Sequence, residues 1–447
     1  MKRSAWRYLW SAHDIRRKLL ITVALLAIYR LAAHVPVPGA NRDAIAQILQ
    51  GGGAGGTLVG LLDLLSGGTV SNFSVLAMGV YPYITSQIIL QLLVPIIPAL
   101  QKRMEDNPRE GQKWMEKWTY LLAVPMAALQ AIGQINLFNT FIPGVTVVEN
   151  FGLFGPTFFP SITIVLSMTA GTMFAIWLGE LISEFGVRNQ GLSLIIFAGI
   201  VSRIPQSLIR LWADEQYRWI SLILTTVITT ATIFAIVFVQ QGRRNIPVMY
   251  PGRRVGNRMS MPVKGTLPLM VNMAGMIPLI FAQSLLTFPA IIASFFAQSS
   301  VEWIKNFANS VTGLFGGQSS FYWIMYFVMV VAFTFFYTNV LFTQQNYGEN
   351  LKRMGAQIPG VSRGAPTQKY MNKVLSRITF PGALFLGVVA ILPWVLQLLI
   401  PLGKNAGGLL LVQSAGLLIV VGVVRDLFFN IEAELKLHGY TESLLIR

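Results

Sequence analysis

Long apolar runs recur along the whole chain and are separated by polar segments. The hydrocarbon core of a bilayer is about 30 Å thick, and a helix of about 20 apolar residues crosses it. The pattern therefore predicts an all-α integral membrane protein with ten transmembrane helices. The ten runs cover residues 19–34, 75–95, 118–138, 158–181, 192–208, 220–240, 268–295, 321–344, 380–401 and 409–424.

The second run differs from the others because a turn-like segment leads directly into it. Residues 64–93 read LLSGGTVSNFSVLAMGVYPYITSQIILQLL, with Ser66, Gly67 and Gly68 close to the apolar part and no charged loop between them. Irregular backbone cannot face lipid, but it is tolerated at membrane depth where protein encloses a water-filled cavity. We therefore expect residues 60–73 to lie inside such a cavity, with Gly67 and Gly68 as a flexible hinge.

Composition agrees with a multi-pass membrane protein and excludes several classes of function. Of the 447 residues, 54% are hydrophobic and 12% are charged. Cysteine is absent, which excludes disulfides and thiol chemistry, and the three histidines are too scattered to bind a metal together. The apolar runs contain no paired carboxylates and no nucleophile beside a base. We therefore expect neither an enzyme nor a bound cofactor.

The basic charge of the chain follows its predicted topology. There are 34 Lys and Arg residues against 18 Asp and Glu, a net charge of +16. If the N-terminus is cytoplasmic, most of the Lys and Arg residues fall in cytoplasmic segments, as the positive-inside rule requires. We therefore place both termini in the cytoplasm: a basic amphipathic start, 1–18, without a signal-peptide cleavage site, and a tail, 425–447. The charge gives no reason to expect specific DNA binding.

Two of the cytoplasmic loops are longer than a simple helix connection requires. The loop 241–267 contains no acidic residue, and its run RNIPVMY predicts a β-hairpin with Arg243 and Arg244 at its base. The loop 346–378 is also basic and is rich in Gly and Pro. Both loops fit docking to an acidic or RNA-bearing partner, and both also fit attraction to anionic lipid headgroups.

Six stretches resemble the SecY family, the channel subunits of the Sec protein translocase. In chain order they are DIRRKLLITVALLAIYRLAAHVPVPGAN, LLSGGTVSNFSVLAMGVYPYITSQIILQLL, GLSLIIFAGIV, QQGRRNIPVMY, LPLMVNMAGMIPLIFAQSLLTFPA and FNIEAELKLHGY. The resemblance implies two pseudo-symmetric, inverted five-helix halves, 19–210 and 211–424, around an hourglass pore with a lateral gate. It also implies a channel that passes unfolded secretory polypeptides and releases transmembrane segments sideways into lipid.

The resemblance assigns roles to individual residues. The implied pore ring consists of Val80, Ile84, Leu192, Ile196, Ile280 and Ile419. The implied plug comprises Leu61, Leu62, Leu64, Leu65, Ser66, Gly67 and Gly68. The implied lateral gate comprises Thr85, Ser86, Gln87, Gln283, Ser284 and Phe288. From the residues alone, aliphatic pairs four apart fit helix packing or lipid contact as well as a pore, and the polar residues fit ordinary hydrogen bonds between helices.

The resemblance also implies partners and a location. The partners are SecE-like and SecG-like membrane subunits, the SecA motor ATPase, the ribosome, anionic lipids, and secretory polypeptides with a signal sequence. Arg243, Arg244, Arg353 and Arg363 are the implied docking residues for the motor or the ribosome. Ser362 stands where the family has an arginine, and Arg363 follows it. The implied location is the plasma membrane of a bacterium.

A secondary transporter for a small solute is the alternative function. Ten spans with broken helices suit such a transporter as well. Ion-coupled transporters usually keep ionisable side chains at membrane depth, whereas the runs here contain almost none and the cytoplasmic loops are large. These features favour a polypeptide channel.

Overall fold

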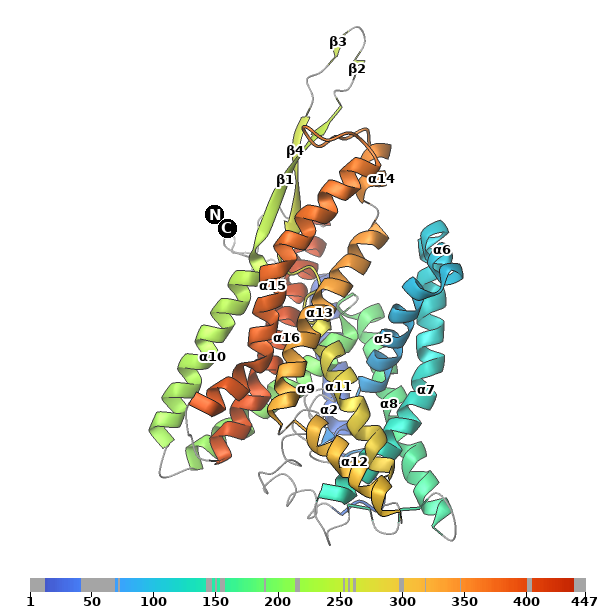
Figure 1. Ribbon diagram of the computed structural model, residues 1–447, viewed down its shortest axis with the longest axis vertical. Coiled ribbons are helices and arrows are strands. Elements are labelled where there is room, and N and C mark those ends of the chain that lie inside the picture. Colours follow the sequence, from blue (N-terminus) through green and yellow to red (C-terminus); the bar gives the residue numbers. More distant parts are fainter. Residues whose placement is uncertain are drawn as a thin grey trace.

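Each of the ten predicted apolar runs coincides with a helix in the structure (Figure 1). The computed structural model describes residues 13–41, 69–70, 73–141, 147–148, 151–152, 157–188, 190–213, 218–251, 254–255, 258–259, 263–296, 301–317, 319–345, 347–399 and 404–437. The ten helices are α2 (His13–Ala32), α5 (Tyr81–Ile96), α7 (Pro108–Phe141), α8 (Phe158–Phe185), α9 (Gly191–Ala213), α10 (Arg218–Gln241), α11 (Ile277–Phe296), α13 (Ser320–Gln345), α15 (Ala365–Leu399) and α16 (Lys404–Leu437).

Three shorter helices complete the helical part: α6 (Pro98–Asp106), α12 (Glu302–Phe315) and α14 (Tyr347–Arg353). Over the described residues, five helices are long and apolar enough to cross a membrane unaided: α7, α8, α10, α13 and α15. Helices α5 and α6 together form a sixth candidate, bent by 101° at the break before Pro98. Proline lacks an N–H and therefore ends or bends a helix at this point.

Several predicted boundaries were wrong. The second helix begins at Tyr81 rather than near residue 75, because residues 73–80 form turns that include Gly79 at a φ of +51°. The seventh begins at Ile277 rather than 268, because residues 263–270 are a strand. The ninth begins at residue 365 rather than 380, so much of the predicted loop 346–378 is helical. The last helix continues beyond residue 424 through 437.

The predicted hairpin at RNIPVMY is confirmed. Strand β1 (Arg243–Tyr250) pairs antiparallel with β4 (Val263–Met270), and the short strands β2 (Arg254–Val255) and β3 (Arg258–Met259) pair beyond them. Arg243 lies opposite Met270, at the base of the hairpin. In Figure 1 the hairpin projects from one end of the helical bundle, together with α14.

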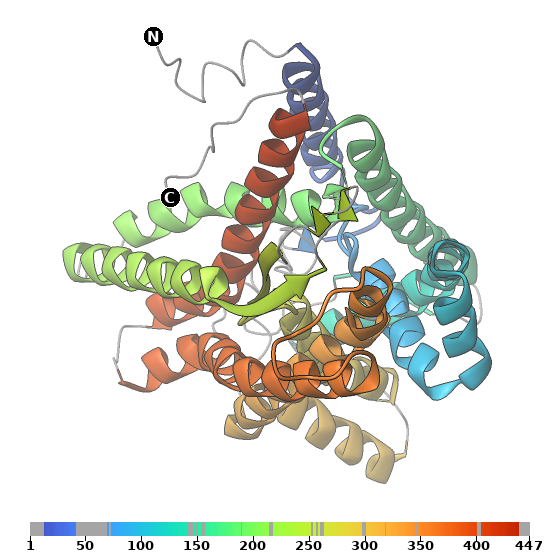
Figure 2. The ribbon, with the colours of Figure 1, turned by 90° about the horizontal axis from the view of Figure 1, so that it is seen from above.

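Contacts between the helices trace a closed ring. Helix α5 packs on α7, α7 on α8, α8 on α9, α9 on α16, α16 on α15, α15 on α13, and α13 on α11, which returns to α5 and α7. Helix α2 packs on α8 and α9, and α10 packs on α9 and α16. Viewed from above in Figure 2, the helices surround a central region. The first five long helices therefore form one side of the ring and the last five the other.

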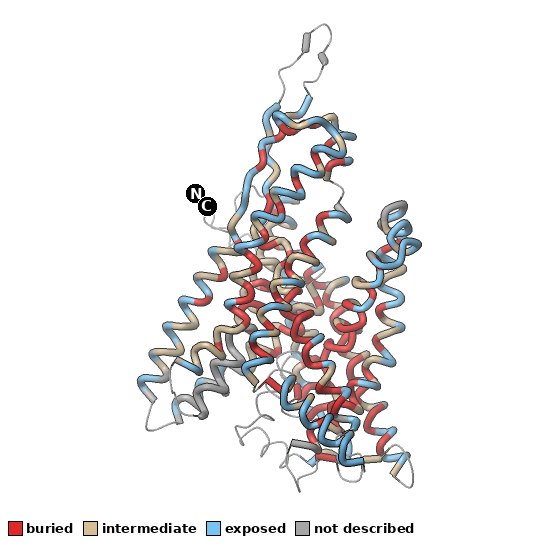
Figure 3. Tube along the Cα trace, in the orientation of Figure 1, coloured by how far each residue is buried: buried red, intermediate tan, exposed pale blue. Residues whose placement is uncertain are grey.

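Each side of the ring has its own apolar core. Met168, Ile135 and Phe138 pack in a core built chiefly from the first five helices, and Tyr326 and Leu386 pack in one built from the last five. Buried positions concentrate inside the bundle and exposed ones on its outer faces (Figure 3). Many of the exposed side chains are large and apolar, as a lipid-facing surface requires.

Candidate functional site: a central constriction and a seam beside it

The six aliphatic residues of the implied pore ring come from both sides of the ring: five lie on α5, α9, α11 and α16, and Val80 directly precedes α5. Val80, Ile196 and Ile419 are buried in one cluster, against which Ile84 and Leu192 pack. Ile280, from α11, is buried with Tyr81 and contacts Ile84. The structure therefore brings the six side chains into one continuous apolar contact.

Local structure explains how these residues reach the same place. Val80 is the residue before α5, and its carbonyl accepts a hydrogen bond from the Ile84 N–H (3.2 Å), so both residues lie on one face. Pro82 occupies the first turn of α5, where its missing N–H costs no helical hydrogen bond. Leu192 and Ile196 are likewise four apart, at the start of α9.

A collar of aliphatic side chains has a definite physical behaviour. It offers no fixed hydrogen bonds, so it does not hold one passing side chain in preference to another. When the collar is closed, water leaves the constriction, and a dewetted apolar gap is a barrier to ions. The arrangement therefore suits a passage that must seal at rest and admit varied side chains.

Beside the constriction, α11 forms a seam with α5 and α7. The Tyr81 hydroxyl lies 3.2 Å from Thr287 Oγ1 across this seam. Thr287 donates its own proton to the Gln283 carbonyl (2.7 Å) within α11. Because that single proton is engaged, we assign Tyr81 as the donor to Thr287. Further along, α7 approaches α11 so closely that a Cβ on Gly133 would lie 2.3 Å from Ile291.

Two of the implied gate residues on α5 form hydrogen bonds within the α5 and α7 side of the seam. Thr85 and Ser86 donate to the Pro82 carbonyl (2.9 and 2.8 Å), and Thr85 accepts a hydrogen bond from Gln130 Nε2 of α7 (3.1 Å). Their described hydrogen bonds therefore join α5 to itself and to α7. The third, Gln87, is half-buried.

The implied gate residues of α11 divide between the interior and the outside. Gln283 and Ser284 are buried, whereas Phe288 is exposed on the outer face of the helix. A hydrogen bond from α5 to α11 joins Tyr81 and Thr287, two residues that were not among the predicted gate residues. One signal was present in the sequence, since Thr287 lies one turn after Gln283.

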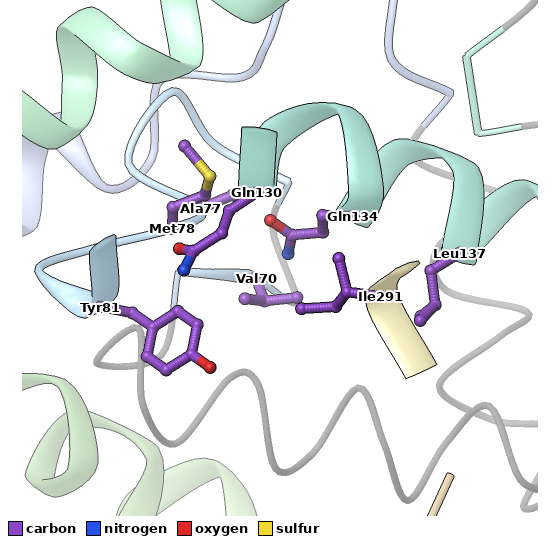
Figure 4. A pocket seen from close by; sticks show the side chains of 8 residues that line it. All are labelled: Val70, Ala77, Met78, Tyr81, Gln130, Gln134, Leu137 and Ile291. Atoms are coloured by element: carbon purple, nitrogen blue, oxygen red, sulfur yellow. The ribbon is translucent and has the colours of Figure 1, made fainter. Parts of the chain in front are cut away.

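A small cavity lies where the seam meets the turns before α5 (Figure 4). It encloses about 20 Å³, which is room for about one water molecule. Its lining residues are Val70, Ala77, Met78, Tyr81, Gln130, Gln134, Leu137 and Ile291. Gln130 Oε1 has no hydrogen-bond partner among the described residues, and Gln134 is also buried. The seam at this level is therefore uncharged and mostly apolar, with the polar groups of Tyr81, Gln130 and Gln134 among aliphatic side chains.

The implied plug residues, 61–68, lie outside the described residues. The described residues that follow them are held firmly by the first five helices. Thr69 Oγ1 donates to the Leu76 carbonyl (2.6 Å), Val70 is buried, and Phe73 meets Phe138 edge to face, with ring centroids 5.6 Å apart. Thr69, Val70 and residues 73–80 are therefore packed in place between the expected plug and α5.

The two long loops that we expect to be cytoplasmic form one packed unit. The backbones of Met249 and Gln357 exchange two hydrogen bonds (2.8 and 2.9 Å). Beneath them, Ile246 and Val248 of β1 are buried with residues of α13, α14 and α15. The implied docking residues Arg243, Arg244, Arg353 and Arg363 are exposed on this unit. Arg243 lies over the Phe429 ring (5.8 Å), and Arg353 lies 3.8 Å from Glu349.

A ring of helices that is closed by aliphatic side chains and has an uncharged seam on one side defines a gated membrane channel. Comparison with known proteins gives the family. The SecY family model matches residues 74–428, and the chain belongs to this family. It is therefore a protein-conducting channel subunit of the Sec translocon rather than an enzyme, and the solute-transporter alternative is set aside.

Curated relatives match over nearly their full lengths. The protein translocase subunits SecY of Aquifex aeolicus (strain VF5) and of Streptomyces galbus are 37% and 35% identical to the chain, each match covering 96% of both proteins. Among solved structures, one described as a protein conducting channel matches with a TM-score of 0.62 at 16% identity, covering 98% of this chain and 99% of the other. Sec61 in a canine ribosome-channel complex matches with a TM-score of 0.60, also at 16% identity and with the same coverage.

Proposed function

We propose that unfolded polypeptides with a signal sequence pass through the aliphatic constriction, and that their apolar segments leave sideways through the seam between α11 and the pair α5 and α7. The observation that carries this proposal is the meeting of both sides of the ring at one aliphatic collar, with the seam directly beside it. The collar seals around the passing chain, and the seam leads from it towards lipid.

The two sides of the ring meet along the seam and again opposite it, and this proposal gives these two lines of contact different roles. Helices α9, α10 and α16 join the sides opposite the seam. The salt bridge between Lys18 and Glu434 adds to this join, as do apolar contacts of Ile15 with Ile431 and Leu435. We assign this line as the hinge and the seam as the gate, so the units that move are 19–210 and 211–424.

The segment 60–73 acts as the plug in this proposal. Its apolar residues Leu61, Leu62, Leu64 and Leu65 would close the space beneath the collar, and the packed residues Thr69, Val70 and Phe73 would limit how far they travel. A related structure is described as one in which the plug domain of the SecY protein stabilises the closed state and maintains a membrane seal. We extend that role to this chain, with Gly67 and Gly68 as the hinge.

The packed loop unit is the docking platform. Arg243, Arg244, Arg353 and Arg363 present positive charge to a motor ATPase of the SecA kind or to ribosomal RNA. Related channels have been solved in ribosome-channel complexes, one canine and one from yeast. The proposal places the chain in a bacterial plasma membrane with both termini cytoplasmic, among anionic lipids and with SecE-like and SecG-like subunits.

Because the chain contains no cysteine, a reversible cross-link across the seam tests the gate directly. In the double variant Tyr81→Cys/Thr287→Cys, a cleavable bifunctional thiol reagent would tie α5 to α11. We expect the reagent to block transport of a secretory protein into reconstituted vesicles, and cleavage of the reagent to restore it.

The control is Thr85→Cys/Gln130→Cys, because these hydrogen-bonded residues tie α5 to α7 on one side of the ring. A cross-link at this pair should leave transport unchanged. Full transport through the channel cross-linked at positions 81 and 287 would contradict the proposal that the seam must open.

A further inference from the structure

Helix α12 (Glu302–Phe315) lies obliquely at the end of the bundle opposite the β1 and β4 hairpin (Figures 1 and 2). It connects the end of α11 to the start of α13. Its apolar positions form one broad face, while Lys305, Asn306 and Asn309 lie exposed on the other side. This pattern is that of a strongly amphipathic helix.

One half of the apolar face is covered by protein. Ala308 is buried against Ala293 of α11, and Val311 packs beside them. One helical turn further, Phe315 meets Phe321 edge to face, with ring centroids 5.9 Å apart. Helix α12 is therefore packed against the end of α11 and against the start of α13.

The other half of the apolar face is exposed. Trp303 is 74% exposed and Phe307 is 63% exposed, and their rings stack with centroids 6.2 Å apart. Leu314 is exposed on the same side, at 44%. These three positions share one face, because Phe307 lies one helical turn after Trp303 and Leu314 lies two turns after Phe307. Large apolar side chains that are exposed together in this way are typical of a surface that contacts lipid or another molecule.

This edge continues surfaces that already face lipid. Phe288, Ile292 and Phe295 form an exposed stripe along α11, which leads towards α12. The same end of the bundle carries further exposed aromatic side chains at helix ends: Phe159, Trp212, Trp219 and Phe321. Tryptophan and other aromatic residues gather at the boundary between acyl chains and headgroups. The aromatic edge of α12 lies at the same end of the bundle as these residues.

We infer that α12 is an interfacial membrane anchor: its Trp303, Phe307 and Leu314 edge inserts between phospholipids at the bilayer surface, while its Asn306 and Asn309 side faces water. An amphipathic helix with this division of side chains lies in the plane of the interface. Because Ala308 and Val311 fasten α12 to α11, the anchor ties the end of that helix to the lipid surface. This inference holds whether or not α11 moves as a gate.

Single cysteines report the environment of each position, because the native chain has none. Nitroxide labels at Trp303→Cys, Phe307→Cys, Asn306→Cys and Asn309→Cys would be compared in the assembled translocase, reconstituted in vesicles of phosphatidylethanolamine and phosphatidylglycerol. Collisions with oxygen report lipid, and collisions with a water-soluble nickel chelate report water. Ile292→Cys and Arg353→Cys serve as the lipid and water references.

We expect labels at 303 and 307 to match the 292 reference, with collisions with the nickel chelate lost, and labels at 306 and 309 to match the 353 reference. Labels at 303 and 307 that match the 353 reference would overturn the inference. Shielding of both positions from both reagents would also overturn it, because a protein partner would then cover the edge.

A second measurement avoids any disturbance by the label. Trp303→Phe keeps an aromatic ring and removes one fluorophore. The difference between the emission of the native protein and that of the variant is the contribution of Trp303. In vesicles with brominated acyl chains, this contribution should be quenched. A Trp303 contribution that is unquenched by brominated lipid would refute the anchor.

Discussion

The Tyr81 to Thr287 hydrogen bond is a polar link across the seam, and its removal should favour the open channel. Tyr81→Phe removes the donor hydroxyl and keeps the ring, which is buried beside Ile280 and Ile84. A hydrogen bond between neutral groups contributes about 1 kcal/mol, and bonds between transmembrane helices fall in the same range. Because 1.4 kcal/mol is a factor of ten in an equilibrium constant, the ratio of open to closed channels should rise about fivefold.

The assay is single-channel recording of the reconstituted complex in planar bilayers, where the open fraction is read directly. The matched control is Tyr83→Phe. Tyr83 is two residues further along the chain and packs on Tyr120 of α7 (5.3 Å between ring centroids), on the same side of the ring. Its hydroxyl has no described bond to α11, so the open fraction should stay near that of the native channel.

A double-mutant cycle with Thr287→Val makes the prediction specific to the pair. Residues in direct contact show a coupling free energy, whereas distant residues add independently. Each single variant should raise the open fraction, and the double variant should raise it little further. Strict additivity of the two substitutions, or a closed channel in both single variants, would refute the role of this bond.

Three further predictions concern the docking loops, the plug and the turns before α5. Charge reversal at Arg243 and Arg244 should abolish motor-driven transport into vesicles, because the hairpin base loses its attraction for an acidic partner; undiminished transport and motor affinity would count against the platform. Deletion of residues 61–71 should leave transport largely intact but make the resting channel leak ions in conductance recordings, so an ion-tight deletion would argue against the plug. In Gly171→Ala the new Cβ would lie 2.1 Å from a backbone carbonyl in the turns before α5. This variant should lose thermal stability, by about 1 to 3 kcal/mol for overpacking, whereas Gly313→Ala, with nothing within 4 Å, should not.

The sequence predicted the number and order of the long helices because membrane burial demands long apolar runs, and such runs are visible without an alignment. It misplaced the start of the seventh helix because the strand sequence LPLM is itself apolar, and a short apolar run does not reveal whether it is strand or helix. It misplaced the start of the ninth because residues 365–379 form a polar helix outside the apolar run. Hydropathy does not detect a helix of that kind.

The site was predictable only in part. The implied ring residues came from the resemblance, since Val80 and Ile84 by themselves fit any packed helix. The Tyr81 to Thr287 contact joins residues 206 positions apart, and a single sequence contains no signal for such a pairing. Thr85 and Ser86 were identified as polar, but their partners Pro82 and Gln130 emerged only once the helices were placed side by side.

The central claim is that the polypeptide passes through the aliphatic constriction. The most direct measurement is photocrosslinking of a stalled secretory chain to a reactive side chain at Ile84 or Ile280, compared with Ile89 and Leu285, which are exposed on the outer faces of the same two helices. The account predicts cross-links to the secretory chain from Ile84 and Ile280 and to lipid from Ile89 and Leu285. Cross-links from Ile89 and Leu285 alone would contradict it.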